Sequence, residues 1–195
     1  MLDRRSRSLV VSVAALVALA AAPVSAQSPD LSTLPLEALV PESIEGYDRI
    51  AVRVLPRPDL ERYHDGASAG LESLWERQGV GEGPISTFDA YINLVRHSTA
   101  EEARAWVEND VREREGAHEA ATVDGRSASL VLYNSGEGAS RHADVTLTLR
   151  QGDTVVDVTV AADGRGATSE LVQTAAREVL GATLSAARAA ADDEG

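Results

Sequence analysis

Four consecutive segments in which apolar and polar residues alternate constrain the fold of this chain more than any other feature. They cover residues 118–123, 126–134, 141–150 and 154–162. A period of two is typical of β-strands with one buried face. The dipeptides Asp124-Gly125 and Gln151-Gly152 stand between segments, where two-residue hairpin turns belong. The pattern therefore predicts an antiparallel meander of four strands.

Pairing the four strands across their turns sorts the side chains onto two faces. With residues 135–140 as the middle loop, Leu132 lies opposite Ala143, and across the last turn Leu147 lies opposite Val156. The expected apolar face consists of Ala121, Val123, Ala128, Leu130, Leu132, Ala143, Val145, Leu147, Leu149, Val156, Val158 and Val160. A slip of one residue at any turn would mix the faces, so the clean separation supports this register.

The remaining elements are two strands and three helices. Residues 47–55 alternate, with Ile50, Val52 and Val54 on one side and Arg49, Ala51 and Arg53 on the other, and residues 88–96 alternate in the same way. Helical spacing covers residues 60–78. A second helix begins after Ser98 or Thr99, where Glu101 or Glu102, three residues on, completes a capping box, and it ends at Gly116. A third helix begins at Thr168 or Ser169.

This element order, β-α-β-α-β-β-β-β-α, predicts an α+β fold. We expect a mostly antiparallel sheet of about six strands with the three helices packed mainly on one face, because the other face is too polar for a three-layer form. Trp75 and Trp106 lie on apolar helix stripes and should pack against the sheet.

The N-terminal segment, residues 1–26, is typical of a cleaved signal peptide. Arg4, Arg5 and Arg7 precede an apolar run, Leu9 to Ala22, that is too short to span a bilayer. Val24 and Ala26 then place small residues at the two positions that a signal peptidase reads. Its removal would change the formal net charge from −13 to −15. The rest of the chain divides into an extended lead-in over residues 27–45, one α+β domain over 46–188 and an acidic flexible tail over 189–195.

The charge and the residue types present exclude several classes of function. The chain has no cysteine, which excludes disulfides, thiolate metal sites and a cysteine nucleophile. An excess of acidic residues argues against nucleic acid and anionic membranes as partners. The glycines at 79–83 lack the pattern of a phosphate loop, the four histidines lack His-x-x-x-His spacing, and no other long apolar segment follows residue 26. We therefore expect no cofactor, no metal and no membrane insertion after signal cleavage.

One cluster of chemically capable residues follows from the register of the meander. His142 and Asp144 share the polar face, Tyr133 lies directly opposite His142, and Asp157 lies diagonally from Asp144, roughly 7–8 Å away. These four residues are the candidate ligand-binding site. A solvated sheet face, without any ligand, is the alternative interpretation.

The layout resembles small exported bacterial proteins of the Mog1/PsbP-like kind. The similar features are the opening residues 39–47 (Leu-Val-Pro-Glu-Ser-Ile-Glu-Gly-Tyr), an Ala/Glu-rich helix after a strand at 98–106, and a Val-rich strand that leads into a final helix. The resemblance implies a non-catalytic accessory or binding module and carries over no site residue. The polar outer face departs from the three-layer form of that fold.

These observations predict an exported binding or accessory module of the bacterial cell envelope, located outside the cytoplasm. Its partner would be an envelope protein or a small ligand that the residues do not identify. The alternative is a metal-assisted or acid/base hydrolase that uses His142, Asp144 and Asp157 on the polar sheet face.

Overall fold

The computed structural model describes residues 28–78, 80 and 84–193. The strands are β1 (Tyr47–Val54), β2 (Ala67–Arg77), β3 (Thr87–His97), β4 (Ala117–Val123), β5 (Arg126–Ser135), β6 (His142–Gln151) and β7 (Thr154–Asp163). The α-helices are α1 (Arg57–Tyr63), α2 (Ala100–Glu113) and α3 (Ser169–Asp193), and the 3-10 helices are η1 (Leu31–Thr33), η2 (Leu36–Leu39) and η3 (Gly138–Ser140). The signal peptide expected over 1–26 lies outside the described residues.

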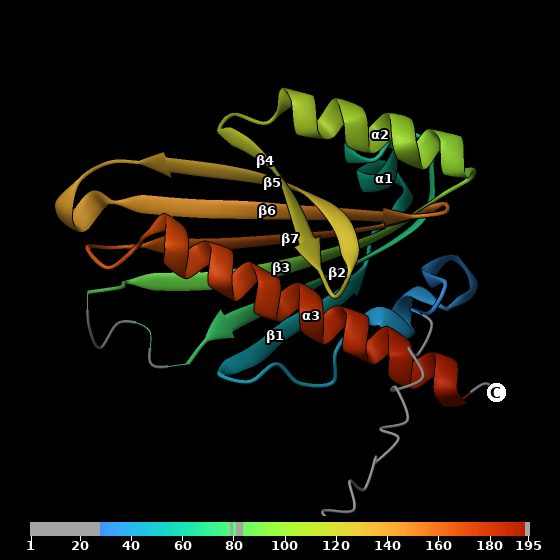
Figure 1. Cartoon of the computed structure of the whole chain (residues 1–195), viewed down its shortest axis with the longest axis horizontal. Coiled ribbons are helices and arrows are strands. Elements are labelled where there is room, and N and C mark those ends of the chain that lie inside the picture. The colour runs from blue at the N-terminus through green and yellow to red at the C-terminus, as the bar shows by residue number, and fades with distance from the viewer. Residues whose placement is uncertain (1–27, 79, 81–83, 194–195) are drawn as a thin grey trace, which may run out of the picture.

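All the strands belong to one antiparallel sheet in the order β1-β2-β3-β7-β6-β5-β4. The α+β class and the antiparallel sheet are confirmed, with seven strands where about six were expected. Pairing of β3 with β7 joins two consecutive meanders, β1 to β3 and β4 to β7, along their inner strands. Figure 1 shows the long sheet with a helix layer on each side.

The meander from β4 to β7 is present, with part of its register offset. The first hairpin pairs Ala121 with Ala128 as expected. In the next pair, Leu132 lies opposite Val145 rather than Ala143. Because this offset is two residues, each side chain keeps its expected face, and the apolar face is buried as the alternation predicts.

The last hairpin is offset by the same amount because its turn differs from the expected one. Leu147 lies opposite Val158 rather than Val156. The two turn residues are Gly152 and Asp153, and of these Gly152 has a positive φ of 60°. A positive φ at the first turn position alone is the geometry of a type II′ hairpin, which favours glycine there.

The segment 60–78, expected as one helix, is the end of a short helix followed by a strand. α1 ends at Tyr63, and Gly66, with a φ of +78°, lies in the turn that leads into β2. Within β2 the indole nitrogen of Trp75 donates to the hydroxyl of Ser73, 3.0 Å away, and both side chains are buried. β2 lies between two other strands and has buried or half-buried positions on both faces, so its apolar residues mimic helical spacing.

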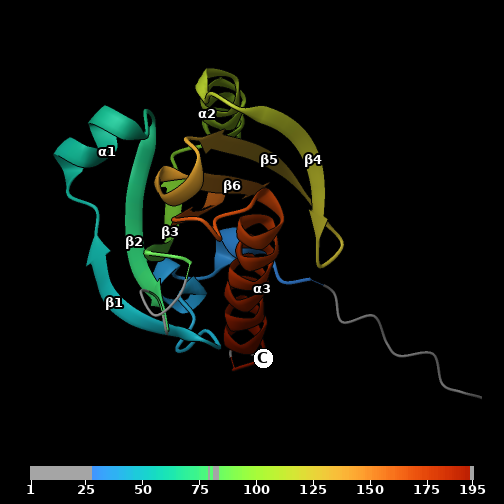
Figure 2. The ribbon, with the colours of Figure 1, turned by 90° about the vertical axis from the view of Figure 1, so that its left-hand side faces the viewer.

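The helices lie on both faces of the sheet, so the expected one-face arrangement is wrong (Figures 1 and 2). α3 covers the apolar face, where Val172, Val179 and Leu180 are buried. α1 and α2 lie across the opposite, polar face. α2 does not need an apolar surface beneath it: Ala103 is its only buried residue among those described, and Arg114, which caps its C-terminal end, binds polar groups of the sheet.

β1 contains a bulge that changes which of its residues share a face. The register with β2 shifts between Arg49 and Ala51, so Ile50 is the additional residue. As a result Arg49 shares the apolar side of the sheet with Val52, whereas Arg53 remains on the polar side, opposite Glu72. Simple alternation, which placed both arginines on one face, therefore fails at this strand.

The two ends of the described chain are more ordered than expected. The lead-in contains η1 and η2 and buries five apolar side chains under the sheet: Leu31, Leu34, Leu36, Leu39 and Ile44. At the other end α3 continues to Asp193, so residues 189–193, expected in a flexible tail, are helical. Thr99 and Thr168 accept hydrogen bonds from the first turns of α2 and α3, as the capping pattern predicts.

Candidate functional site

The polar face of the sheet is covered at one end and open at the other. At the covered end α1 and α2 lie across the strands, and Figure 1 shows that α2 stops short of the end where β6 begins and β7 finishes. We call the uncovered part the open face. It consists of half-buried or exposed side chains from five strands: Glu76, Asp89, Tyr91, Tyr133, His142, Asp144, Ala161 and Asp163.

A row of carboxylates crosses the open face. Glu76 lies directly opposite Asp89, Asp89 opposite Ala161, and Ala161 opposite Asp144. Partial burial raises the pKa of Asp89, and the negative charges of Glu76 and Asp163 raise it further. Like charges directly opposite one another destabilise a sheet, so this row costs stability.

His142 is held between two carboxylates. Its Nδ1 lies 2.8 Å from an oxygen of Asp163, and its Nε2 lies 2.9 Å from an oxygen of Asp144. The hydrogen bond to Asp163 raises the pKa of His142, and the bond to Asp144 adds to this effect. Thr87 donates to Asp163 at 2.6 Å, which with His142 lowers the pKa of that carboxyl. Both ring nitrogens are therefore engaged by carboxylates, and in the protonated imidazole both donate, which leaves no lone pair for a metal.

The structure brings three of the four candidate site residues together. Tyr133 lies opposite Asp144 rather than His142, yet its ring centroid is 6.2 Å from that of His142. Asp157 lies elsewhere, opposite Thr148 under α2. The two-residue offset separates it from Asp144 by four positions along the sheet, roughly 13 Å.

Asp157 belongs to an ion pair that attaches α2 to the sheet. Its side chain is 4% exposed, and its two oxygens accept from Arg114 at 2.9 Å and from Thr148 at 2.8 Å. Arg114 also donates to Asp110 at 2.7 Å and to Thr146 at 2.9 Å. Burial raises the pKa of Asp157, and the guanidinium of Arg114 opposes that rise. Every polar group of this buried cluster is thus satisfied, as structural ion pairs require.

The hydrolase constellation of His142, Asp144 and Asp157 is consequently not assembled. His142 has both nitrogens engaged, and Asp157 is bound by Arg114 away from the open face. Across residues 28–78, 80 and 84–193, no group of three or more histidine, cysteine, aspartate or glutamate side chains is arranged to hold a metal ion.

A second cluster, which sequence reasoning missed, surrounds Trp106. The indole ring of this half-buried residue lies against His64 and His97, with centroid distances of 5.1 and 5.8 Å, and its nitrogen donates to the carbonyl of Tyr63. Burial lowers the pKa of both histidines. The apolar stripe of α2 indicated that Trp106 faces inward, but nothing in the spacing showed that it meets two histidines.

The helices of the described part of the chain include none with the length and apolar character needed to cross a bilayer. The fold and the open face together define a three-layer α+β domain with one exposed, carboxylate-rich sheet surface.

Comparison with known proteins identifies no family for the chain. No family model matches, and no curated protein matches. Similar solved structures include the extracellular domain of PknH from Mycobacterium tuberculosis, with 18% identity, a TM-score of 0.34 and coverage of 68% of this chain and 77% of that one. A protein from Bacteroides thetaiotaomicron has 10% identity and a TM-score of 0.39, with coverage of 70% of this chain and 43% of that one. The chain thus spans less than half the length of the second protein.

Proposed function

We propose that the chain is a non-catalytic binding or accessory module that acts outside the cytoplasm, and that the open face binds a protein partner presenting cationic side chains. The observation that carries this proposal is the pairing of Glu76 with Asp89 on an uncovered sheet surface. A cationic group placed over Ala161, the small residue between Asp89 and Asp144, would meet carboxylates on both sides.

The aromatic residues of the open face support the same function. Tyr91 and Tyr133 are half-buried; Tyr91 lies beside the carboxylate row, two residues from Asp89 on β3, and Tyr133 lies at the end of the row, opposite Asp144. Tyrosine is enriched at protein interfaces, where its ring packs against the partner and its hydroxyl forms hydrogen bonds. The contacts of His142 with Asp144 and Asp163 would hold the two carboxylates in place before a partner binds.

Two parts of the proposal rest on sequence patterns alone. Export depends on the signal peptide expected over residues 1–26, and the accessory role agrees with the Mog1/PsbP-like resemblance in element order. The Mog1/PsbP-like fold has three layers, and the polar outer face of the sheet had argued against that form. Helices on both faces of the sheet remove this difference and so support the resemblance.

A titration with an arginine-rich synthetic peptide tests the function. We expect the peptide to raise the melting temperature of the chain, and added salt to weaken the binding, because a native-state ligand stabilises the fold and exposed charges are screened. Asp89→Asn should weaken peptide binding several-fold and slightly stabilise the free chain, because it removes the repulsion from Glu76.

Glu119→Gln on β4 is the matched control, since it removes one exposed negative charge away from the open face. Equal binding by the Asp89→Asn and Glu119→Gln variants would show that the peptide responds only to net charge. That result would exclude the open face as the binding surface.

A further inference from the structure

The exposed large apolar side chains of the described chain are concentrated on one edge of the sheet. Ile50, Val52 and Val54 of β1 are 54%, 45% and 70% exposed. β1 is an edge strand, so among the residues that the structure describes no strand neighbours the outward-facing half of its backbone N–H and C=O groups. A long apolar edge of this kind is a template for pairing with another strand.

The opposite edge of the sheet shows the usual protection. The exposed residues of β4 are small or polar, and none of them is a large apolar side chain. The apolar character of β1 is therefore a property of this strand and not of both edges.

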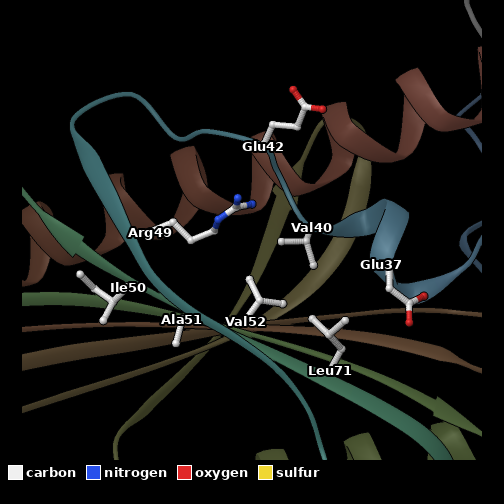
Figure 3. A pocket seen from close by; sticks show the side chains of 8 residues that line it. All are labelled: Glu37, Val40, Glu42, Arg49, Ile50, Ala51, Val52 and Leu71. Atoms are coloured by element: carbon white, nitrogen blue, oxygen red, sulfur yellow. The ribbon is translucent and has the colours of Figure 1, made fainter.

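A groove adjoins β1 on the apolar side of the sheet (Figure 3). It has a volume of about 640 Å³, lies between η2 and the strand, and is lined by Val40, Val52 and Leu71, with Glu37 and Glu42 at its rim. Side chains on one face of an added strand could enter this space, which would remove the apolar surface of the edge from water.

The bulge at Ile50 makes the charges of β1 self-complementary. Asp48 lies opposite Glu76, and Arg53 lies opposite Glu72, so both side chains are on the polar face. Without the bulge, residues five positions apart would point to opposite faces.

We infer that β1 pairs antiparallel with β1 of a second copy of the chain, with Asp48 of each copy opposite Arg53 of the other. In this register the two Ile50 bulges lie near the two-fold axis, and Tyr47 lies opposite Val54. The faces match at the pairs Tyr47–Val54, Asp48–Arg53 and Arg49–Val52, and the two sheets join into one continuous sheet. Because a two-fold axis relates the two copies, the Asp48–Arg53 pair occurs twice in the interface.

Charge complementarity favours a second copy over an unrelated strand. Asp48 has an acidic neighbour across the strand, Glu76, and its carboxylate accepts a hydrogen bond from the neutral amide of Gln78 at 2.8 Å. Arg53 is 57% exposed while it contacts Glu72 at 2.8 Å, so its guanidinium can bridge Glu72 and an Asp48 from the second copy. Pairing thus supplies a cation to Asp48 and Glu76, for which the described residues form no ion pair.

Charge exchange at these two positions tests the inference by light scattering and analytical ultracentrifugation of the purified chain. We expect the wild-type chain to dimerise in a concentration-dependent manner. Arg53→Asp and Asp48→Arg each place like charges opposite one another twice, so each should raise the dimer dissociation constant about tenfold or more. An equimolar mixture of the two variants should form a heterodimer, because positions 48 and 53 then face each other with opposite charges at both places.

Arg104→Asp is the matched control, because it makes the same change in charge on an exposed part of α2, where the Arg104 side chain is 59% exposed. It should dimerise like the wild type. Circular dichroism would establish that every variant is folded. A wild-type chain that stays monomeric at all concentrations overturns the inference, and so does a dimer that Arg53→Asp leaves intact. Failure of the two variants to associate when mixed would exclude this register. Peptide binding to the open face is measured separately and does not depend on these outcomes.

Discussion

Replacing Arg114 with methionine should strongly destabilise the attachment of α2 to the sheet. The substitution keeps much of the apolar length of the side chain and removes its charge and its hydrogen bonds. Asp157, 3% exposed, would then retain one partner, Thr148, and its carboxylate would be buried without a cation.

The magnitude follows from the burial of the pair. Removing one partner of a buried ion pair costs about 3–5 kcal/mol, because the remaining charge stays out of water. For a domain of this size that loss corresponds to a decrease of roughly 6–20 °C in melting temperature. Arg104→Met on the same helix breaks an exposed pair, with side chains 59% and 69% exposed, so it should change stability by less than about 0.5 kcal/mol.

Urea denaturation at two pH values, followed by circular dichroism, measures this difference. Burial raises the pKa of Asp157, and without Arg114 only the hydrogen bond from Thr148 opposes the rise. Below that raised pKa the folded state holds a proton on Asp157, so the penalty of Arg114→Met should shrink as the pH falls. The double variant Arg114→Met, Asp157→Asn should be more stable than Arg114→Met alone at neutral pH. A penalty no larger than that of Arg104→Met, or one independent of pH, would refute this account of the buried pair.

The remaining predictions concern how stability depends on the pH through the histidines and how it responds to substitution of two glycines. The carboxylate partners of His142 raise its pKa above 6.5. The protonated ring therefore stabilises the fold fully below pH 6.5, and this contribution is lost as the pH rises through the folded-state pKa. His142→Gln should lower the free energy of unfolding more in acid than in base. His64 and His97 have pKa values lowered by burial, so they should destabilise the fold as the pH falls from 6.5, and His97→Phe should reduce the acid sensitivity of the melting temperature. Gly116→Ala should destabilise the chain severely, because φ is +133° and the new methyl group would lie 2.3 Å from the carbonyl oxygen of Leu132. Gly181→Ala in α3 meets nothing within 4 Å and should instead stabilise by about 1 kcal/mol, and thermal denaturation of both variants would check the opposite signs.

The candidate site shows how far sequence patterns reach. The alternation of β6 placed His142 and Asp144 on one face, and the meander brought Tyr133 close to them, although Tyr133 lies opposite Asp144 and not opposite His142. Asp163 was not among the candidates, although it forms the shorter of the two His142 contacts. Its partnership depends on the register of β6 against β7, which differs by two residues from the one that the Gln151-Gly152 turn indicated.

The local pattern of residues determined which face each side chain of the β4–β7 meander occupies. Alternation has a period of two, and the burial of one face penalises any odd-numbered slip, so this information is contained in short stretches of chain. The starts of α2 and α3 were predictable to within one residue for the same reason, since a cap involves only the first turn of its helix; Thr99 and Thr168, each one of two alternatives, are the caps.

Only the tertiary structure decided the features that depend on contacts between distant segments. The two-residue offset preserves every face, so hydrophobic patterning alone cannot select between the two registers. Residues 67–77 became a strand because they fill the sheet between β1 and β3 on both faces, which overrides their helical spacing. α2 covers the polar face because Arg114 meets Asp157, 43 residues away in the chain, in a contact that no local period encodes.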